Sequence, residues 1–177
     1  MGKIIFILGG ARSGKSSYAV KLAKAGKKVA FIATCIPKDK DMQKRIELHK
    51  KHQPSNWHIF EEPNDIASLV RLKKVGSKFD IIVIDCLTLF VSNLLLQGLK
   101  GEFVEDKINE MVKSLKSAKY KSIIVSNEVG LGVHPRTELG RKFRDLAGRV
   151  NQMVAKKSDS VFFMISGLPL KVKGKKR

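Results

Sequence analysis

Glycines, a lysine and a serine are spaced in this chain as a phosphate-binding loop requires. They read Gly9-x4-Gly14-Lys15-Ser16, and the apolar run 4–8 ends directly before them. An anion with several charges is held best by converging backbone N–H groups, and glycines allow the chain to approach closely and to adopt positive φ. The segment therefore predicts a P-loop that binds a nucleoside triphosphate.

Each polar position of this motif has an expected role. Lys15 would reach the β and γ phosphates and act in catalysis, and the Ser16 hydroxyl would hold Mg²⁺. A helix that begins near Gly14 would direct its partly positive N-terminus at the phosphates. The residues expected to line this part of the nucleotide site are Gly9, Gly10, Ala11, Arg12, Ser13, Gly14, Lys15 and Ser16.

A carboxylate ends a second apolar run. Asp85 directly follows residues 81–84, which is the placement of a Walker B carboxylate at the carboxyl end of a strand beside the P-loop. From there it would bind Mg²⁺ directly or through water. An Asp can also end a strand only to cap the next helix. Its occurrence together with a P-loop favours the metal role.

Polar residues follow a third apolar run, 122–126. Asn127 and Glu128 come next, so they are expected at the same edge of the sheet as the P-loop and Asp85, where ligands bind in open α/β sheets. The segment 140–152 then carries several cations and amides. These could contact phosphate, or they could form salt bridges on a surface helix, and the local sequence leaves both open.

The apolar runs alternate with segments of helical spacing or composition, which is the pattern of a parallel sheet. Strands covered on both faces read as continuous apolar runs. We therefore predict an α/β fold with a mostly parallel central sheet flanked by helices. Strands are predicted at 4–8, 29–33, 81–85, 122–126 and 161–165. Helices are predicted at 14–25, 40–52, 64–74, 86–97, 103–118 and 136–156, with loops at 98–102 and 130–135.

The length of 177 residues, of which 43% are hydrophobic, fits one domain with a substantial core. We expect a single nucleotide-binding catalytic domain over 1–170 and a basic tail over 171–177. No apolar run approaches the roughly 20 residues that a membrane helix needs, so no membrane span and a cytoplasmic location are expected. Cys35 and Cys86 are expected to be buried or site-lining thiols, not a disulfide.

The formal net charge of +19 is large for this length. Such a charge can indicate nucleic-acid binding, attraction of anionic substrates, or lysine-rich solvated faces. The lysines are spread over many segments, and no RNA-binding aromatic pattern or helix-turn-helix signature accompanies them. Solvated faces are therefore favoured, no nucleic-acid partner is expected, and a basic P-loop protein that binds nucleic acid remains the alternative of a different class.

A histidine lies among cations in the polar segment 41–52. His49 follows Arg45 by four residues and precedes Lys50 directly. Nearby cations favour the neutral, nucleophilic imidazole that an attack on phosphorus needs. From the local sequence alone, a solvated lysine-rich helix is the more ordinary interpretation.

Taken in order, these motifs resemble the bifunctional adenosylcobinamide kinase/adenosylcobinamide-phosphate guanylyltransferase family of cobalamin nucleotide-loop assembly. The resemblance runs along almost the whole chain, and GGARSGKS and FRDxAGRVNQ are its most specific marks. The matching segments are 9–16 (GGARSGKS), 32–34 (IAT), 45–49 (RIxxH), Trp57, Glu61, 93–95 (NLL), 127–132 (NEVGxG), 143–152 (FRDxAGRVNQ) and 166–167 (SG).

The resemblance implies a P-loop NTPase (RecA-like) three-layer fold and an enzyme with two activities. It would phosphorylate adenosylcobinamide with GTP or ATP and Mg²⁺, and then transfer GMP from GTP onto adenosylcobinamide phosphate through a GMP-histidine intermediate. By family position that histidine is His49. The resemblance also implies a homotrimer and a GTP site that includes Ala33, Thr34, Lys50, Glu61 and Asp85, with Glu61 as a contact for guanine or ribose.

Two positions depart from the family pattern. Gln53 stands where an Arg often precedes the Pro, which puts a phosphate contact there in doubt, and Asp85 occupies a position where Glu is also found. The nearest rival within enzymes is a guanylyltransferase or a P-loop kinase that has lost its partner activity, and a GTP-binding protein that lacks guanylyl transfer is a further alternative. The nucleotide preference of the kinase step is left open.

Overall fold

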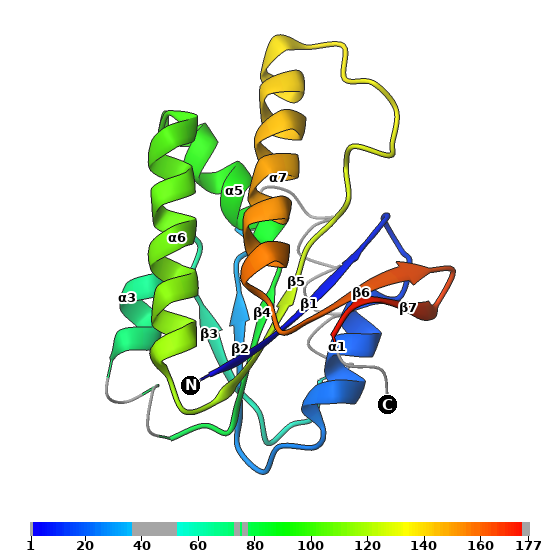
Figure 1. Cartoon of the computed structure of the whole chain (residues 1–177). Helices are drawn as coiled ribbons and strands as arrows, with labels where there is room; N and C mark the ends of the chain where they lie inside the picture. The colour runs from blue at the N-terminus through cyan, green and yellow to red at the C-terminus, as the bar shows by residue number, and fades with distance from the viewer. Residues whose placement is uncertain (1, 37–52, 73–74, 76–77, 175–177) are drawn as a thin grey trace.

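The computed structural model describes residues 2–36, 53–72, 75 and 78–174. Within them, one sheet is flanked by helices on both faces (Figure 1). The elements in chain order are β1 (Lys3–Gly9), α1 (Lys15–Ala23), β2 (Val29–Ala33), β3 (His58–Glu61), α3 (Ile66–Arg71), β4 (Ile81–Asp85), α5 (Leu87–Leu96), α6 (Gly101–Ser117), β5 (Lys121–Val125), α7 (Glu138–Lys157), β6 (Ser160–Ile165) and β7 (Leu168–Lys173).

The described strands form one sheet in the order β3-β2-β4-β5-β1-β6-β7. All neighbouring strands from β3 to β6 are parallel, and only β7 is antiparallel, because it forms a hairpin with β6. The carboxyl ends of the parallel strands therefore meet at one edge. The mostly parallel α/β fold that the sequence predicts is confirmed.

The side chains of each central strand point alternately to two cores. On one face, Phe6 and Ile82 pack with residues of α3, α5, α6 and α7. On the other face, Ile7 and Val83 pack with α1 and with Trp57. Burial on both faces explains why these strands read as continuous apolar runs.

All five predicted strands are present, and every one of their bounds agrees with the prediction within one residue. Two strands were not predicted. Three of the four residues of β3 and every residue of β7 are exposed, so neither strand produces a continuous apolar run. The strand β7 also contains residues 171–173, so the domain boundary expected at 170 lies inside it.

The predicted helices are found as α1, α3, α5, α6 and α7, and the helix predicted at 40–52 lies outside the described residues. The helix α6 begins at Gly101, so the loop predicted at 98–102 is too long at its second end. The loop predicted at 130–135 is confirmed. No helix in the described part of the chain is long and apolar enough to cross a membrane.

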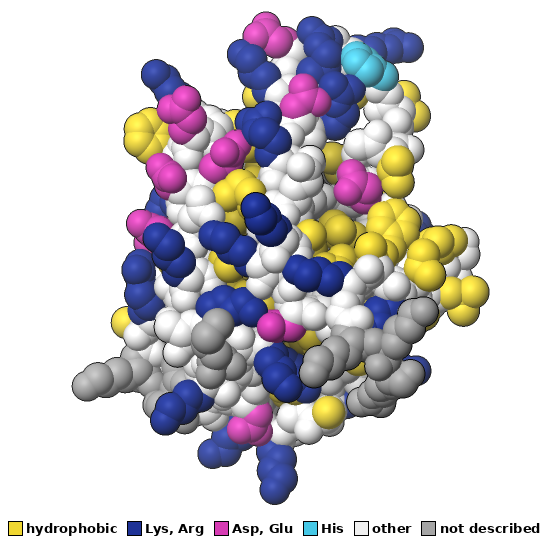
Figure 2. Space-filling view, in the orientation of Figure 1, with side chains coloured by type: hydrophobic (Ala, Val, Ile, Leu, Met, Phe, Trp, Pro, Cys, Tyr) yellow, Lys and Arg dark blue, Asp and Glu magenta, His cyan; other side chains and the backbone are white. Residues whose placement is uncertain are grey.

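Charged and apolar side chains are distributed differently over the surface. Figure 2 shows Lys and Arg scattered over the visible face with Asp and Glu among them, whereas apolar side chains gather on the right, around the β6–β7 hairpin. In this hairpin, Leu168 is 73% exposed and Val172 is 64% exposed. The scattered cations agree with solvated faces, and the hairpin is the more distinctive surface.

Candidate nucleotide-binding site

The P-loop connects β1 to α1 at the carboxyl edge of the sheet. Gly9 ends β1 with φ of 152°, and Gly14 precedes the first turn of α1 with φ of 90°. A Cβ atom on Gly9 would lie 2.7 Å from the carbonyl oxygen of Met164, and one on Gly14 would lie 3.2 Å from the Cα of Gly167. Both positions therefore require glycine, for their backbone conformation and for the close approach of the β6–β7 hairpin.

The P-loop is also tied to that hairpin by a hydrogen bond. The N–H of Gly167 donates to the carbonyl oxygen of Ser13 over 3.0 Å. Within the loop, the N–H of Ser13 donates to the carbonyl oxygen of Gly10 over 3.3 Å. Ala11 and Arg12 lie exposed at the tip, and Arg12 has a positive φ of 55°. These hydrogen bonds fix the backbone of the loop directly before the N-terminus of α1.

Lys15 is the buried cation of the loop. Its side chain is only 7% exposed, and its Nζ donates to the carbonyl oxygen of Gly10 and, over 3.5 Å, to Oγ of Ser13. Burial lowers the pKa of Lys15, and electrostatic interactions with Cys86 and Asp85 oppose this shift. An ammonium group that has lost most of its water, at a helix N-terminus, is well placed to bind an anion.

The remaining predicted residues of this edge lie in one row across three strands. Glu61 on β3 is in register with Ala33 on β2, and Ala33 is in register with Asp85 on β4. Asp85 interacts electrostatically with Lys15, so this carboxylate belongs to the P-loop region. Ala33, Asp85 and the P-loop therefore lie at the same edge of the sheet, where the sequence predicts Asp85 and the resemblance implies Ala33.

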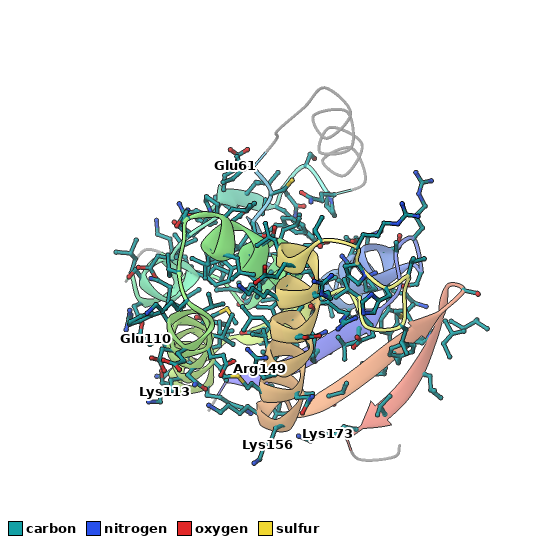
Figure 3. All side chains as sticks on the ribbon, turned by 90° about the horizontal axis from the view of Figure 1, so that it is seen from above. Glu61, Glu110, Lys113, Arg149, Lys156 and Lys173 are labelled. Carbon is teal, nitrogen blue, oxygen red and sulfur yellow. The ribbon has the colours of Figure 1, made fainter. Side chains whose placement is uncertain are left out.

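Glu61 lies at the same edge but far from the loop. Four strand spacings of about 4.8 Å, roughly 19 Å in all, separate β3 from β1. Figure 3 shows Glu61 at the outer margin of the molecule, pointing away from the sheet. Glu61 is therefore too distant to contact a phosphate held in the P-loop of the same chain. The ribose and base of the nucleotide would extend further from the P-loop toward Glu61.

Thr34 fixes the end of β4 from the neighbouring strand. Its Oγ1 donates to the carbonyl oxygen of Cys86 over 2.7 Å and accepts from the N–H of Cys86 over 2.9 Å. Its own N–H donates to the carbonyl oxygen of Asp85 over 3.3 Å. Thr34 is fully buried. The polar groups of Thr34 are thus engaged inside the protein, where they hold Asp85 and Cys86 in place.

The two cysteines are free thiols beside this carboxylate. Burial, and then the charge of Asp85, raise the pKa of Cys86 to about 12. The same two causes, in the same order, raise the pKa of Cys35, which is half-buried. Neither thiol is prepared to act as a nucleophile, because the thiolate is the reactive form.

A buried polar network holds the end of β5 and was not predicted. Oγ of Ser126 lies 3.0 Å from Oγ1 of Thr88 and donates to Oδ1 of Asn151 over 2.8 Å. All three side chains are at least 95% buried. The N–H of Asn127 donates to Oγ1 of Thr88 over 2.6 Å, and Nδ2 of Asn151 donates to the carbonyl oxygen of Asn127 over 3.2 Å.

One signal for this network was present in the sequence. Asn151 follows Ala147 by one helical turn on the buried side of α7, so a polar residue stands at a core position of an otherwise apolar stripe. A buried amide must find hydrogen-bond partners. The prediction that Asn127 and Glu128 lie beside the P-loop is confirmed, since the N–H of Glu128 donates to the carbonyl oxygen of Gly9 over 3.0 Å.

Three cations of α7 form ion pairs within the protein. Arg149 bonds Glu105 on α6 over 2.8 Å, Arg144 bonds its neighbour Asp145 over 2.8 Å, and Lys142 bonds Glu138 over 2.7 Å. The sequence left two interpretations open for the cations of segment 140–152, phosphate contacts or salt bridges, and the structure contains salt bridges there.

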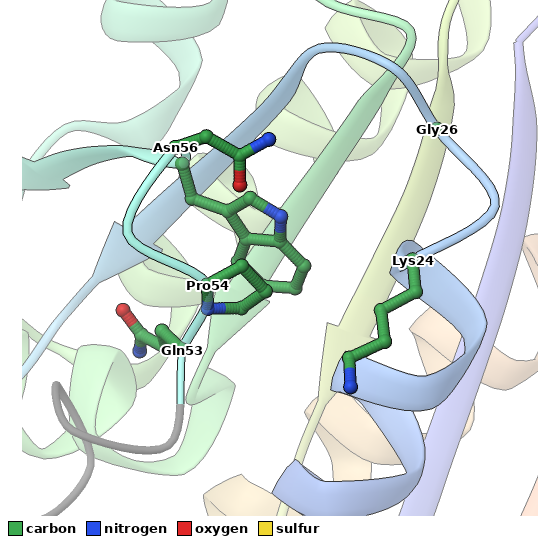
Figure 4. Close-up of a pocket in the computed structure, with 6 residues that line it drawn as sticks. Lys24, Gly26, Gln53, Pro54 and Asn56 are labelled. Atoms are coloured by element: carbon green, nitrogen blue, oxygen red, sulfur yellow. The ribbon is translucent and has the colours of Figure 1, made fainter.

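Two predicted site residues, His49 and Lys50, lie outside the described residues, as does Arg45. Gln53 is described, and it lines a surface pocket of about 590 Å³ together with Lys24, Gly26, Pro54, Asn56 and Trp57. Figure 4 shows Lys24 on one side of this pocket and the segment from Gln53 to Asn56 on the other. Because Lys24 follows the last turn of α1 whereas the P-loop precedes the first, this pocket is not the phosphate site.

The residues at the P-loop suit a magnesium ion. Mg²⁺ prefers hard oxygen ligands and is usually held by one or two protein groups together with phosphates and water. The Ser16 hydroxyl at the start of α1 and the Asp85 carboxylate are donors of this kind. Within the described residues there is no cluster of three His, Cys, Asp or Glu side chains that would hold a metal alone. The donor set therefore fits Mg²⁺ that arrives with a nucleotide.

Comparison with known structures supports the fold. The structure of the flagellar accessory protein FlaH from Methanocaldococcus jannaschii superposes with a TM-score of 0.60 at 14% sequence identity, covering 98% of this chain and 79% of FlaH. At that identity the likeness concerns the fold alone. The P-loop motif and this likeness together confirm the P-loop NTPase fold class.

Comparison with known sequences is more specific. The chain is 40% identical to the bifunctional adenosylcobalamin biosynthesis protein CobP of Pseudomonas aeruginosa, over 95% of this chain and 96% of the relative. It is 35% identical to the proteins named CobU of Salmonella typhimurium and Escherichia coli K12, over 96% of this chain and 99% of each relative. The model of the cobinamide kinase / cobinamide phosphate guanyltransferase family matches residues 5–172. The chain therefore belongs to this family of bifunctional transferases.

Proposed function

We propose that this chain phosphorylates the hydroxyl of adenosylcobinamide with a nucleoside triphosphate and then transfers GMP from GTP onto the resulting phosphate. The products of the second step would be adenosylcobinamide-GDP and pyrophosphate. The observation that carries the proposal is the P-loop with its buried Lys15 beside Asp85, in a chain that matches the family over residues 5–172.

In the kinase step the protein mainly positions groups and neutralises charge, because phosphoryl transfer needs little covalent chemistry from the enzyme. Lys15 would contact the β and γ phosphates, and the N–H groups of 9–16 would surround them. Ser16 and Asp85 would hold Mg²⁺, which supplies further charge neutralisation when it is bound with the nucleotide.

In the second step we propose that His49 carries the GMP group. The imidazole nitrogen would attack the α phosphorus of GTP, and pyrophosphate would leave. The phosphate of the acceptor would then attack the same phosphorus, which forms the new P–O–P link and releases the imidazole. A covalent intermediate of this kind splits one transfer into two displacements.

We further propose that the nucleotide site is lined by Gly9 to Ser16, Ala33, Thr34, Lys50, Glu61 and Asp85. Their roles differ. Thr34 would act by holding Asp85, since its polar groups bond to Asp85 and Cys86. Glu61 would contact ribose or guanine, since it lies roughly four strand spacings from the P-loop strand.

We also propose that the protein is a cytoplasmic homotrimer with one catalytic domain in each chain. Support for self-association comes from the β6–β7 hairpin, where apolar side chains are exposed: Ile165, Leu168, Leu170 and Val172. An apolar cluster of this kind commonly marks an interaction surface. Light scattering of the purified protein would test the trimer.

The test of the function is the intact mass of the protein after incubation with GTP and Mg²⁺. The wild type and the control His58→Ala, which changes an exposed histidine, should gain one GMP group. The variant His49→Ala should gain none, and addition of adenosylcobinamide phosphate should remove the group from the wild type. Absence of the adduct, under conditions in which GTP binding is measured, would leave a P-loop kinase or GTP-binding protein.

A further inference from the structure

Glu128 is a carboxylate beside the P-loop to which the proposed function assigns no role. It follows β5, the strand that lies between the P-loop strand β1 and the Asp85 strand β4. Its N–H donates to the carbonyl oxygen of Gly9, the first residue of the P-loop, over 3.0 Å. Its side chain is half-buried, so part of it remains accessible to a substrate.

The Glu128 carboxylate is held from two sides. Its Oε1 accepts from the N–H of Gly130 over 3.1 Å, and its Oε2 accepts from Nδ2 of Asn151 over 3.5 Å. Asn151 is itself fixed by Ser126 in the buried network. Each carboxylate oxygen has two lone pairs, so both can accept a further hydrogen bond from a substrate. The network thus presents an oriented acceptor group beside the P-loop.

The other carboxylates at this edge are less suited to receive a proton from an acceptor. Asp85 interacts electrostatically with Lys15 and is the proposed ligand of Mg²⁺. Glu61 lies on β3, at the far side of the sheet from β1. Among the described residues that follow the strands at this edge, Glu128 is the carboxylate that directly adjoins the P-loop backbone.

The two proposed reactions differ in their need for a base. The kinase step uses an alcohol, whose proton must be removed as the new bond forms, whereas the guanylyl step uses a phosphate that is already ionised at neutral pH. Resting on the proposed function, we propose that Glu128 is the general base of the kinase step and that Asn151 is a positioning residue that orients it. The acceptor is thus an alcohol placed between Glu128 and the γ phosphate.

The proposed step balances as follows. The alcohol oxygen forms a bond to the γ phosphorus, and the bond from that phosphorus to the β,γ-bridging oxygen breaks. The alcohol proton passes to Glu128, and the nucleoside diphosphate leaves with the electron pair of the broken bond. General base catalysis typically contributes 10²–10⁴-fold, so the loss on removing this base is expected to be of that order.

The test compares both reactions in the same preparations of wild type, Glu128→Gln and Glu128→Ala. The kinase kcat should fall about 10²-fold or more in both variants, while formation of the GMP adduct and its transfer to adenosylcobinamide phosphate stay within about threefold of wild type. Formate should restore part of the kinase kcat of Glu128→Ala and none of that of Glu128→Gln, because only the smaller side chain leaves room for it.

Asn151→Asp and Asn151→Ala test the positioning role. Each should lower the kinase kcat with little change in the KM for the nucleotide and less effect on guanylyl transfer. Adduct formation also reports that each variant is folded.

Two results would overturn the proposal for Glu128: an unchanged kinase kcat in Glu128→Gln, or an equal loss of both reactions, which would make Glu128 a group that serves the nucleotide or its metal. If a Glu128 variant fails to fold, Glu128→Asp, which keeps the carboxylate, should retain guanylyl transfer and lose kinase kcat. Equal retention of both by Glu128→Asp would contradict a closely placed base. If the wild type itself shows neither reaction, the proposed function fails, and that outcome is distinct from failure of this inference.

Discussion

The side-chain amide of Asn93 donates a hydrogen bond to the carbonyl oxygen of Thr34 over 2.8 Å, and so joins α5 to the end of β2. The same Nδ2 donates to the carbonyl oxygen of Pro63 over 3.3 Å. Asn93 is only 7% exposed and Thr34 is fully buried. One amide group therefore holds together the segments that follow two neighbouring strands at the edge of the proposed site.

We expect Asn93→Ala to lower the free energy of unfolding by about 1–3 kcal/mol, because it leaves the buried carbonyl of Thr34 without this donor. Urea unfolding followed by circular dichroism measures the loss. The matched control is Gln97→Ala on the next turn of the chain, whose exposed amide bonds Asn64 over 2.6 Å. The control should change stability by less than about 0.5 kcal/mol. If the two variants lowered the free energy of unfolding equally, the buried Asn93 hydrogen bond would contribute no more than an exposed one.

We expect Lys15→Met to separate function from stability. Both reactions should fall by on the order of 10²-fold or more, because the cation at the phosphates is lost. The folded protein should be at least as stable as the wild type at neutral pH. Burial lowers the pKa of Lys15, so folding disfavours its protonated form, and a neutral apolar side chain avoids that cost.

The measurements for Lys15 are calorimetric GTP binding and thermal unfolding without nucleotide. Lys21→Met is the control, since Lys21 lies exposed on the same helix; it should bind GTP as the wild type does. The lowered pKa of Lys15 also determines how the stability cost of burying it depends on pH. The cost of burying Lys15 is present below the folded pKa and disappears as the pH rises through the unfolded value of 10.5. A Lys15→Met protein that unfolds at a clearly lower temperature would contradict this account.

Much of the fold followed from local sequence, for a physical reason. Strands such as β4, buried on both faces, must be apolar at every position, and the P-loop needs its residue types at fixed spacing. The strand β3 could not be found this way, because three of its four residues are exposed and it forms through its register with β2. Nor could β7, whose strand pairing is with β6 only.

The site was predicted in part for the same reason. Asp85 and Glu128 each follow an apolar strand, so the topology alone places them at one edge. The network of Thr88, Ser126 and Asn151 joins residues 25 and 38 positions apart. No local pattern specifies such pairs, and only the polar residue at a core position of α7 hinted at them.

Cysteine alkylation tests the surroundings of the proposed site. We expect iodoacetamide at neutral pH to modify Cys35 faster than Cys86, because Cys35 is half-buried and Cys86 is fully buried with its pKa raised to about 12. Both should react more slowly than in urea, since burial raises the pKa of Cys35 too. GTP with Mg²⁺ should slow the reaction at Cys35, which follows Thr34 at the site edge. Peptide mass mapping over time measures the rates, and faster labelling of Cys86 would contradict the structure.

A carboxylate far from the site should govern part of the stability at acid pH. Oδ2 of Asp159 accepts from the N–H of Ile4 and from Nζ of Lys116, each over 2.7 Å. Partial burial acts to raise the pKa of Asp159, but Lys116 and the Ile4 amide outweigh it, and the pKa lies below its ordinary value of 3.8. The ionised form is therefore favoured by folding, so its contribution is present above pH 3.8 and is lost as the pH falls through the folded pKa.

We expect Asp159→Asn to lower the free energy of unfolding by about 0.5–1 kcal/mol at pH 7, a modest value because the Asp159 side chain is 45% exposed. The difference from wild type should shrink as the pH is lowered below 3.8. Urea unfolding at several pH values between 7 and 3 measures it. Asp145→Asn, which removes the partner of Arg144 on the surface of α7, should cost less at pH 7. A difference between wild type and Asp159→Asn that grows toward acid pH would show that the neutral form of Asp159, not the ionised form, is the one that folding favours.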